Sequence, residues 1–192
     1  TGTESLHSGY YIRAGSHIRL HPTGDYFYAA DNGISPSDVE KYDIRSGVAT
    51  YLHDSPYHGD YPFGGDLWMA DDGLRFFTRS GRAFRASEVT SQDMLYNGYL
   101  SDDTSIAWLD SSSVAGYLFA IPLGAVYPAH PRGAIHIYEE DYLSLNSVVE
   151  LPRFQVSSGG EVADYAAEGS YVFSNAEGTE FHALYRAQAG SG

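Results

Sequence analysis

Short runs of alternating apolar and polar residues recur along the chain, each preceded by a polar turn that contains a glycine. Four segments share this plan and run from His21 to Tyr28, Asp71 to Phe77, Ser113 to Phe119 and Ala167 to Phe173. Their turn glycines are spaced 49, 43 and 53 positions apart and are Gly24, Gly73, Gly116 and Gly169. Periods of about 40 to 50 residues with several strands each are typical of β-propellers, in which each repeat forms one small sheet, or blade.

Further strand candidates flank each turn, so that one repeat would contain four strands, A to D from the inside outward. The strand A candidates lie at 17–20, 66–69, 106–109 and 161–165. Strand C candidates lie at 38–44, 81–85, 134–138 and 180–185, and strand D candidates at 49–52, 94–96 and 147–151. No stretch longer than about ten residues carries a helical apolar stripe. The pattern therefore predicts an all-β chain.

These strands predict a single β-propeller-like domain at 1–188 with about four four-stranded antiparallel blades. The blades are expected near residues 17–58, 65–103, 105–157 and 160–187, followed by a flexible tail at 189–192. The fourth blade stops after strand C, whereas residues 6–12 form an outer-strand candidate without a blade of its own. We expect this strand either to complete the last blade and close the ring, which hides sheet edges, or to mark a cut through a longer array.

The amino-acid composition agrees with a β protein and argues against some classes of binding partner. The chain has 17 tyrosines, which suit half-buried strands, and 43% apolar residues, which argue against disorder. Its net charge of −14 argues against nucleic acid and anionic lipid, and fits a solubilising surface, cation binding or a basic partner. There is no cysteine, which excludes disulfides and thiol ligands. No apolar run approaches the roughly 20 residues that cross a bilayer, so we expect no membrane insertion.

The first repeat resembles a known blade motif. The run His21-Pro-Thr-Gly-Asp-Tyr-Phe-Tyr-Ala-Ala-Asp31, followed by Val39-Glu-Lys-Tyr-Asp43-Ile-Arg-Ser-Gly47, resembles the repeat of the YVTN/YncE-like β-propellers. The first half of the fourth repeat also fits, whereas the second and third carry Phe in place of Tyr and lack the strand C aspartate. This resemblance covers about half of the chain. It implies an extracellular, cell-surface or periplasmic setting and a binding or scaffolding role more often than catalysis.

Loops between strands B and C, and between strand D and the next strand A, share one face of a propeller. Three such loops are unusual here, at 31–38, 54–65 and 122–133, and prolines preorganise the last two. Tyr, His and Trp beside Asp are typical of sugar and peptide sites. The candidate ligand-binding residues are Tyr57, His58, Asp60, Tyr61, Phe63, Trp68, Tyr127, His130 and Arg132. The alternative is that these are packed corner loops whose aromatic side chains cap the sheets.

Metal and catalytic motifs are weak. The eight histidines form no HxH or HExxH spacing, and only His58 and Asp60 lie close in one loop, so no metal site is predicted. The acidic pairs at 71–72 and 102–103 match no calcium loop and suit ordinary turns. No nucleophile elbow or phosphate loop occurs. We therefore predict no catalytic residue and no cofactor, and expect Asp66, Glu161 and Arg19 to line the propeller channel.

Three functional hypotheses follow. The first is a non-catalytic extracellular binding or scaffold module that recognises a glycan or a protein through its loop face. The second is a propeller-type enzyme, a lyase or lactonase-like hydrolase, with His58, Asp60 and Arg132 at the channel mouth. The third is a self-assembling subunit, and hence a homo-oligomer, in which the strand at 6–12 completes the sheet of a neighbouring copy.

Overall fold

The computed structural model describes residues 12–33, 35–123, 132–158 and 160–188. Strands dominate these ranges, and the short 3-10 turn η1 (Thr90–Gln92) is the one helical element within them. In the same ranges, no helix is long and apolar enough to cross a membrane. The prediction of an all-β chain is thus confirmed. The strands belong to two compact units, residues 1–99 and residues 100–192.

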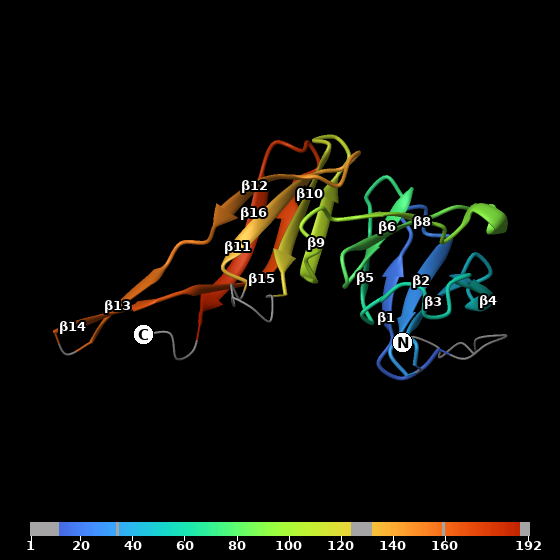
Figure 1. The fold of residues 1–192 in the computed structure, drawn as a ribbon, viewed down its shortest axis with the longest axis horizontal. Helices are drawn as coiled ribbons and strands as arrows, with labels where there is room; N and C mark the ends of the chain where they lie inside the picture. Colours follow the sequence, from blue (N-terminus) through green and yellow to red (C-terminus); the bar gives the residue numbers. More distant parts are fainter. Residues whose placement is uncertain (1–11, 34, 124–131, 159, 189–192) are drawn as a thin grey trace. The chain divides into compact units, whose positions relative to one another are not determined.

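The first unit contains two antiparallel four-stranded sheets, each ordered as in the chain (Figure 1). The first sheet consists of β1 (His17–Leu20), β2 (Tyr26–Asp31), β3 (Asp38–Asp43) and β4 (Thr50–Asp54). The second consists of β5 (Leu67–Met69), β6 (Arg75–Thr78), β7 (Arg82–Arg85) and β8 (Tyr96–Tyr99). The inner strands β1 and β5 are in contact, as expected for neighbouring blades.

Two of the glycines predicted at hairpin turns do lie in turns of this unit. Gly24 between β1 and β2 has φ +78°, and Gly73 between β5 and β6 has φ +72°, a conformation that other residues adopt at a cost. The two turns also touch, because the Nε2 of His21 lies 2.9 Å from the Gly73 carbonyl oxygen and donates to it. This hydrogen bond fastens the first blade to the second at one end of the sheets.

Large aromatic side chains fill the space between the two sheets. Tyr28 of β2 packs against Phe76 of β6, with ring centroids 5.1 Å apart, and Phe84 of β7 lies beside Phe76. All three are fully buried. Burying each such side chain contributes about 1.5–3 kcal/mol, so this cluster favours packing of the two sheets against each other.

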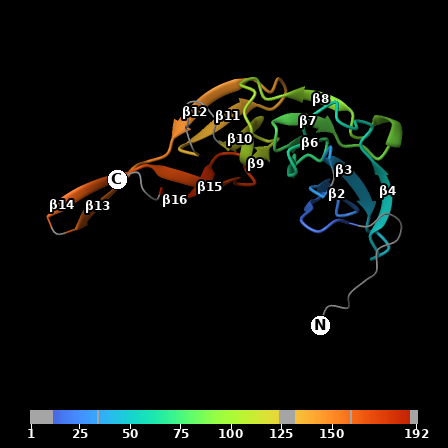
Figure 2. The same cartoon turned by 60° about the horizontal axis from the view of Figure 1, so that its bottom comes forward.

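The second unit begins with a third four-stranded antiparallel sheet, whose strands lie in chain order in both views (Figure 2). Its strands are β9 (Ile106–Ser112), β10 (Tyr117–Pro122), β11 (Ala134–Glu139) and β12 (Leu145–Glu150). Two two-stranded sheets follow, formed by β13 (Phe154–Ser158) with β14 (Glu161–Tyr165), and by β15 (Ala167–Ser174) with β16 (Phe181–Ala187). β15 packs on β9 and β10, where Val172, Phe119 and Ile121 form a small core.

The predicted turn of the fourth repeat is wrong in register. Gly169 lies inside β15 and does not have a left-handed φ. Its lack of a side chain serves close packing instead, because an added Cβ would lie 3.1 Å from the Arg132 carbonyl oxygen. The hairpin turn is at Gly178, which has φ +66° and approaches Ala115 of the preceding turn, as Gly73 approaches His21. β15 and β16 therefore correspond to strands A and B of a fourth blade.

The inner strand of the fourth repeat, predicted at 161–165, also differs in the structure. This segment does form a strand, β14, but its partner is β13 rather than β15. The two strands form a two-stranded ribbon that lies, along the chain, between the third sheet and β15. The strand expected at 6–12 lies outside the described residues except for Ile12, and the tail at 189–192 lies wholly outside them, so ring closure and the tail stay predictions.

Candidate functional site

Two of the three predicted loops meet at one end of the first sheet. The loop 31–38 joins β2 to β3, and the loop 54–65 leads from β4 toward β5, so both leave the sheet at the same end. The side-chain amide of Asn32 donates to the Gly65 carbonyl oxygen at 2.8 Å. A Cβ at Gly59 would lie 3.5 Å from the ring of Pro36. The described residues of the two loops, 31–33, 35–38 and 54–65, thus contact each other, and we call this surface the loop pair.

Hydrogen bonds at its base hold the loop pair in place. The Ser55 amide donates to the Val39 carbonyl oxygen at 2.9 Å, which extends the pairing of β3 with β4 by one bond. The Ser55 hydroxyl oxygen accepts from the Tyr57 amide at 3.0 Å, and the Tyr57 hydroxyl oxygen accepts from the Tyr96 amide at 3.1 Å. The longer loop is therefore anchored to both sheets and is preorganised.

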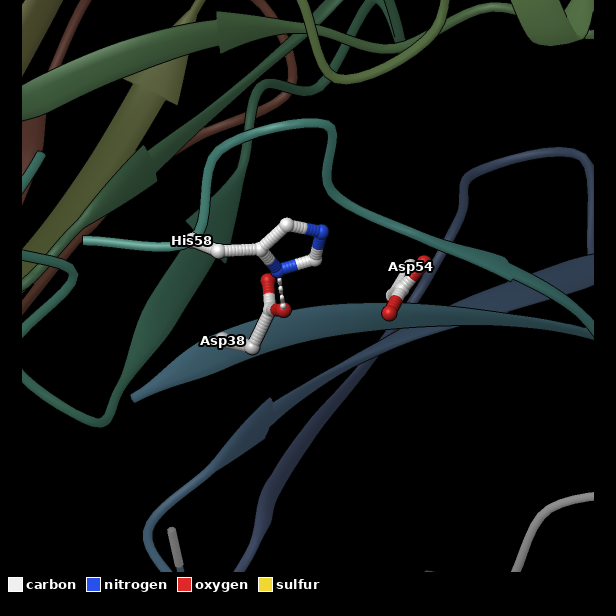
Figure 3. A group of neighbouring side chains, drawn as sticks. All are labelled: Asp38, Asp54 and His58. Atoms are coloured by element: carbon white, nitrogen blue, oxygen red, sulfur yellow. Dashed lines mark hydrogen bonds and ion pairs between the residues drawn. The ribbon is translucent and has the colours of Figure 1, made fainter. Parts of the chain in front are cut away.

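Three ligating side chains converge on the loop pair: Asp38, Asp54 and His58 (Figure 3). Asp38 opens β3, Asp54 ends β4, and His58 comes from the loop that follows. The Nδ1 of His58 lies 3.2 Å from Oδ2 of Asp38, and one ligating atom from each of the three residues falls within 4.8 Å of the others. The Asp38 side chain is 8% exposed and that of His58 is 65% exposed, so the group lies at the surface with a buried floor.

The surroundings of this group are acidic. Burial raises the pKa of Asp38, and the neighbouring Asp54 raises it further, whereas the Val39 amide and His58 act in the opposite direction. Burial, followed by the charges of Asp54 and Glu40, raises the pKa of Tyr51 to about 12. Such a field favours a positive charge over the loop pair.

Several predicted site residues turn inward. Tyr61 stacks on Tyr96 with ring centroids 4.3 Å apart, and Tyr57 meets Tyr61 edge to face. Phe63 is fully buried and Trp68 is 3% exposed. Four of the candidate aromatic side chains therefore pack against or within the first unit, as in the alternative in which aromatic residues cap the sheets.

The remaining candidates have different surroundings. Asp60 is exposed in the loop pair, two residues after His58. Arg132 belongs to the second unit, where its guanidinium lies 3.5 Å from Glu168. Tyr127 and His130 lie outside the described residues. Of these candidates, His58 is paired with Asp38, and Asp60 follows it in the same loop.

Asp38 and Asp54 were not among the potential ligands predicted from the sequence. The strand pattern could have indicated them. Asp54 is paired with Glu40 across β3 and β4, and Asp38 lies two residues from Glu40 on the same face. A hairpin register drawn from sequence would have placed both carboxylates at the end of the sheet from which His58 follows. The pairing of His58 with Asp60 relied on proximity in sequence alone.

Other polar groups have structural roles. Asp66, expected in the channel, is buried and accepts from Arg19 at 3.0 Å and from Arg79 at 3.2 Å, which ties β1 to the start of β5. Glu161 is exposed on β14. Asp72 accepts from the Leu74 amide at 2.8 Å, which is the turn chemistry expected of the acidic pairs.

Comparison with known proteins identifies the fold. No family model and no curated protein matches the chain. A functionally unknown protein from Desulfotomaculum acetoxidans DSM 771 matches over 88% of this chain with a TM-score of 0.56 and 11% identity. The Cps50 (Swd1) β-propeller domain of Myceliophteria thermophila matches over 90% with a TM-score of 0.52 and 13% identity. The WD40 repeats of RRP9 match over 82% with a TM-score of 0.50 and 13% identity.

The chain spans 48%, 53% and 41% of those three structures, respectively. At these levels of identity, the likeness concerns the fold alone. The four-stranded antiparallel sheets arranged in sequence, the glycine turns that touch between neighbouring blades, and these matches together show that the chain has a β-propeller fold.

Proposed function

We propose that this chain is a non-catalytic binding or scaffold module of the β-propeller type, and that it binds a protein through the loop pair 31–38 and 54–65. The observation that carries the proposal is that hydrogen bonds anchor this exposed surface to both sheets, through Ser55 to β3 and through Tyr57 to β8. A preorganised loop loses little conformational entropy when it binds a partner. Blade cores then act as the support, and the loops as the contact surface.

The geometry supports a protein ligand better than a glycan. Sugar sites commonly offer an exposed aromatic face. Here Tyr61 is stacked on Tyr96 and only partly exposed, and Phe63 and Trp68 are buried. The exposed side chains of the described loop pair are instead carboxylates, prolines, an imidazole and the small polar groups of Asn32 and Ser35.

Charge defines the expected partner more closely. Asp54 and Asp60 are exposed on the loop pair, and the whole chain carries a net charge of −14. Complementary charge accelerates association and selects partners. We therefore propose a partner segment that is rich in lysine or arginine. Membership of the YVTN/YncE-like propellers and an extracellular, cell-surface or periplasmic setting remain predictions from the sequence resemblance.

The test uses three sets of probes: lysine- and arginine-rich peptides, matched acidic peptides, and neutral oligosaccharides. The wild-type chain is expected to retain the basic peptides, with affinity falling as salt rises. Asp60→Asn is expected to weaken this binding about fivefold, the scale of one exposed charge.

Glu88→Gln is the matched control, since Glu88 is an exposed carboxylate between β7 and β8, at the opposite end of the sheets. Binding of oligosaccharides alone, or equal loss of peptide binding in the two variants, would contradict the proposal.

A further inference from the structure

We propose that Asp38, Asp54 and His58 form a binding site for one divalent transition-metal ion of the zinc type. The three side chains come from separate segments, yet one ligating atom from each falls within 4.8 Å of the others (Figure 3). One imidazole nitrogen with carboxylate oxygens is a donor set that zinc accepts. This inference goes beyond the proposed protein binding and does not depend on it.

The distance between two of the donors fits a small ion. Zinc binds imidazole nitrogen and carboxylate oxygen at about 2.0–2.2 Å, so two ligands of a tetrahedral site lie about 3.3 Å apart. The Nδ1 of His58 and Oδ2 of Asp38 are separated by 3.2 Å. A carboxylate oxygen of the exposed Asp54 lies within 4.8 Å of both, so a small movement of this side chain would complete the site.

A supporting hydrogen bond orients the buried carboxylate. Oδ1 of Asp38 accepts from the Val39 amide at 2.7 Å, which leaves Oδ2 directed at His58. Outer partners of this kind fix the direction of metal ligands.

Electrostatics favours a dication at this position. The Asp38 carboxylate is nine-tenths buried, and a second carboxylate, Asp54, lies next to it. Behind them, Glu40 is also buried and is hydrogen-bonded by the Tyr42 hydroxyl at 2.7 Å. A bound dication would neutralise the negative charges of Asp38 and Asp54.

The donor set distinguishes zinc-type ions from calcium. Calcium takes six to eight oxygen ligands, whereas this group offers a nitrogen and two carboxylates. Three protein ligands leave at least one coordination position open, and the exposed side of His58 is where it would lie.

The experiment measures metal binding to the whole chain after treatment with a chelator. Isothermal titration calorimetry with zinc chloride is expected to give one site per chain. Cobalt(II) is expected to produce visible absorption bands of a low-symmetry site, a readout that does not depend on any activity. His58→Ala and Asp54→Asn are each expected to weaken zinc binding at least about tenfold.

His182→Ala is the matched control, because His182 lies 3.7 Å from Glu180 and forms an exposed histidine–carboxylate pair with no third ligand among the described residues. This variant is expected to bind zinc as the wild type does. Both His58 and Asp54 are at the surface, so circular dichroism should show unchanged folding in their variants. Absence of zinc binding, equal affinity in His58→Ala, or displacement of zinc by equimolar calcium would overturn the proposal. Because the probe is the metal alone, these outcomes leave the proposed protein binding to its own test.

Discussion

Lys41, the only lysine of the chain, is buried at the centre of a polar network in the first unit. Its ammonium donates to Asp93 at 2.9 Å and to the Ser87 carbonyl oxygen at 2.6 Å, and lies 4.6 Å from the ring centroid of Tyr26. Asp93 also accepts from the Tyr28 hydroxyl at 2.9 Å. This network links β3 to the segment before β8, so a single side chain joins the two sheets.

Lys41→Met is expected to lower the free energy of unfolding by about 3–5 kcal/mol, because it leaves the buried Asp93 carboxylate without its ammonium partner, with His53 as the remaining basic side chain. Urea unfolding followed by tyrosine and tryptophan fluorescence measures the change. Arg45→Met removes an exposed ion pair with Asp43 and is expected to leave the unfolding midpoint where it is. Equal midpoints for the two variants would show that the buried network does not contribute as described.

The second unit has a comparable but more exposed group. Asp102 accepts from the Tyr138 hydroxyl at 2.9 Å and pairs with Nδ1 of His136 at 2.9 Å. Burial alone would raise the pKa of Asp102, but the hydrogen bonds from His136 and Tyr138 outweigh burial and lower it below the ordinary 3.8. Asp102 of the acidic pair thus holds strand β11 in place through His136 and Tyr138.

This lowered pKa predicts how stability depends on pH. A carboxyl whose pKa is lower in the folded state stabilises the fold above its unfolded pKa, and this contribution disappears as the pH falls through the folded value. Asp102→Asn should therefore cost about 1 kcal/mol at pH 7, discounted for partial exposure. The difference from wild type should shrink below about pH 4. Urea unfolding at pH 7, 5 and 3 tests this, and a gap that widens in acid would refute it.

At the scale of elements, hairpin turns define the blades, but a glycine in sequence does not identify its turn. The tripeptide Ala-Glu-Gly occurs at 167–169 and again at 176–178. The first copy fits the expected period and lies within β15, whereas the second forms the turn. The inserted β13–β14 ribbon lengthens the repeat, which is why spacing selected the wrong copy.

The neighbouring turns offer a matched test of this assignment. Gly116 and Gly178 both have positive φ, +72° and +66°, but a Cβ at Gly116 meets nothing within 4 Å. At Gly178 it would lie 2.9 Å from the Ala115 backbone nitrogen. Gly116→Ala should cost about 1 kcal/mol from backbone conformation alone.

Gly178→Ala should cost roughly twice as much, since the turn must also move away from its neighbour. Thermal unfolding of the two variants gives the comparison. A Gly178→Ala variant as stable as Gly116→Ala would mean that the turns of the third sheet and of β15–β16 do not touch.

At the scale of the whole molecule, the all-β fold and three four-stranded sheets could be predicted, because alternation and turn chemistry are local properties of the sequence. The site was less predictable. Asp38 and His58 are 20 residues apart and meet only through the pairing of β3 with β4. Likewise, nothing local in the sequence distinguishes the packed rings of Tyr61 and Phe63 from exposed ones, since the faces that cover them come from other strands.

The β13–β14 ribbon has a consequence for how this propeller can vary. Phe154 at its start is paired with Tyr165 at its end, so the chain leaves and returns at adjacent points. Its residues Val156 and Val162 are 49% and 65% exposed, and the ribbon belongs to no four-stranded sheet. A segment with neighbouring ends can be shortened, extended or exchanged for a foreign peptide while the flanking strands keep their places. The junction between β12 and β15 is thus a natural grafting position on this scaffold.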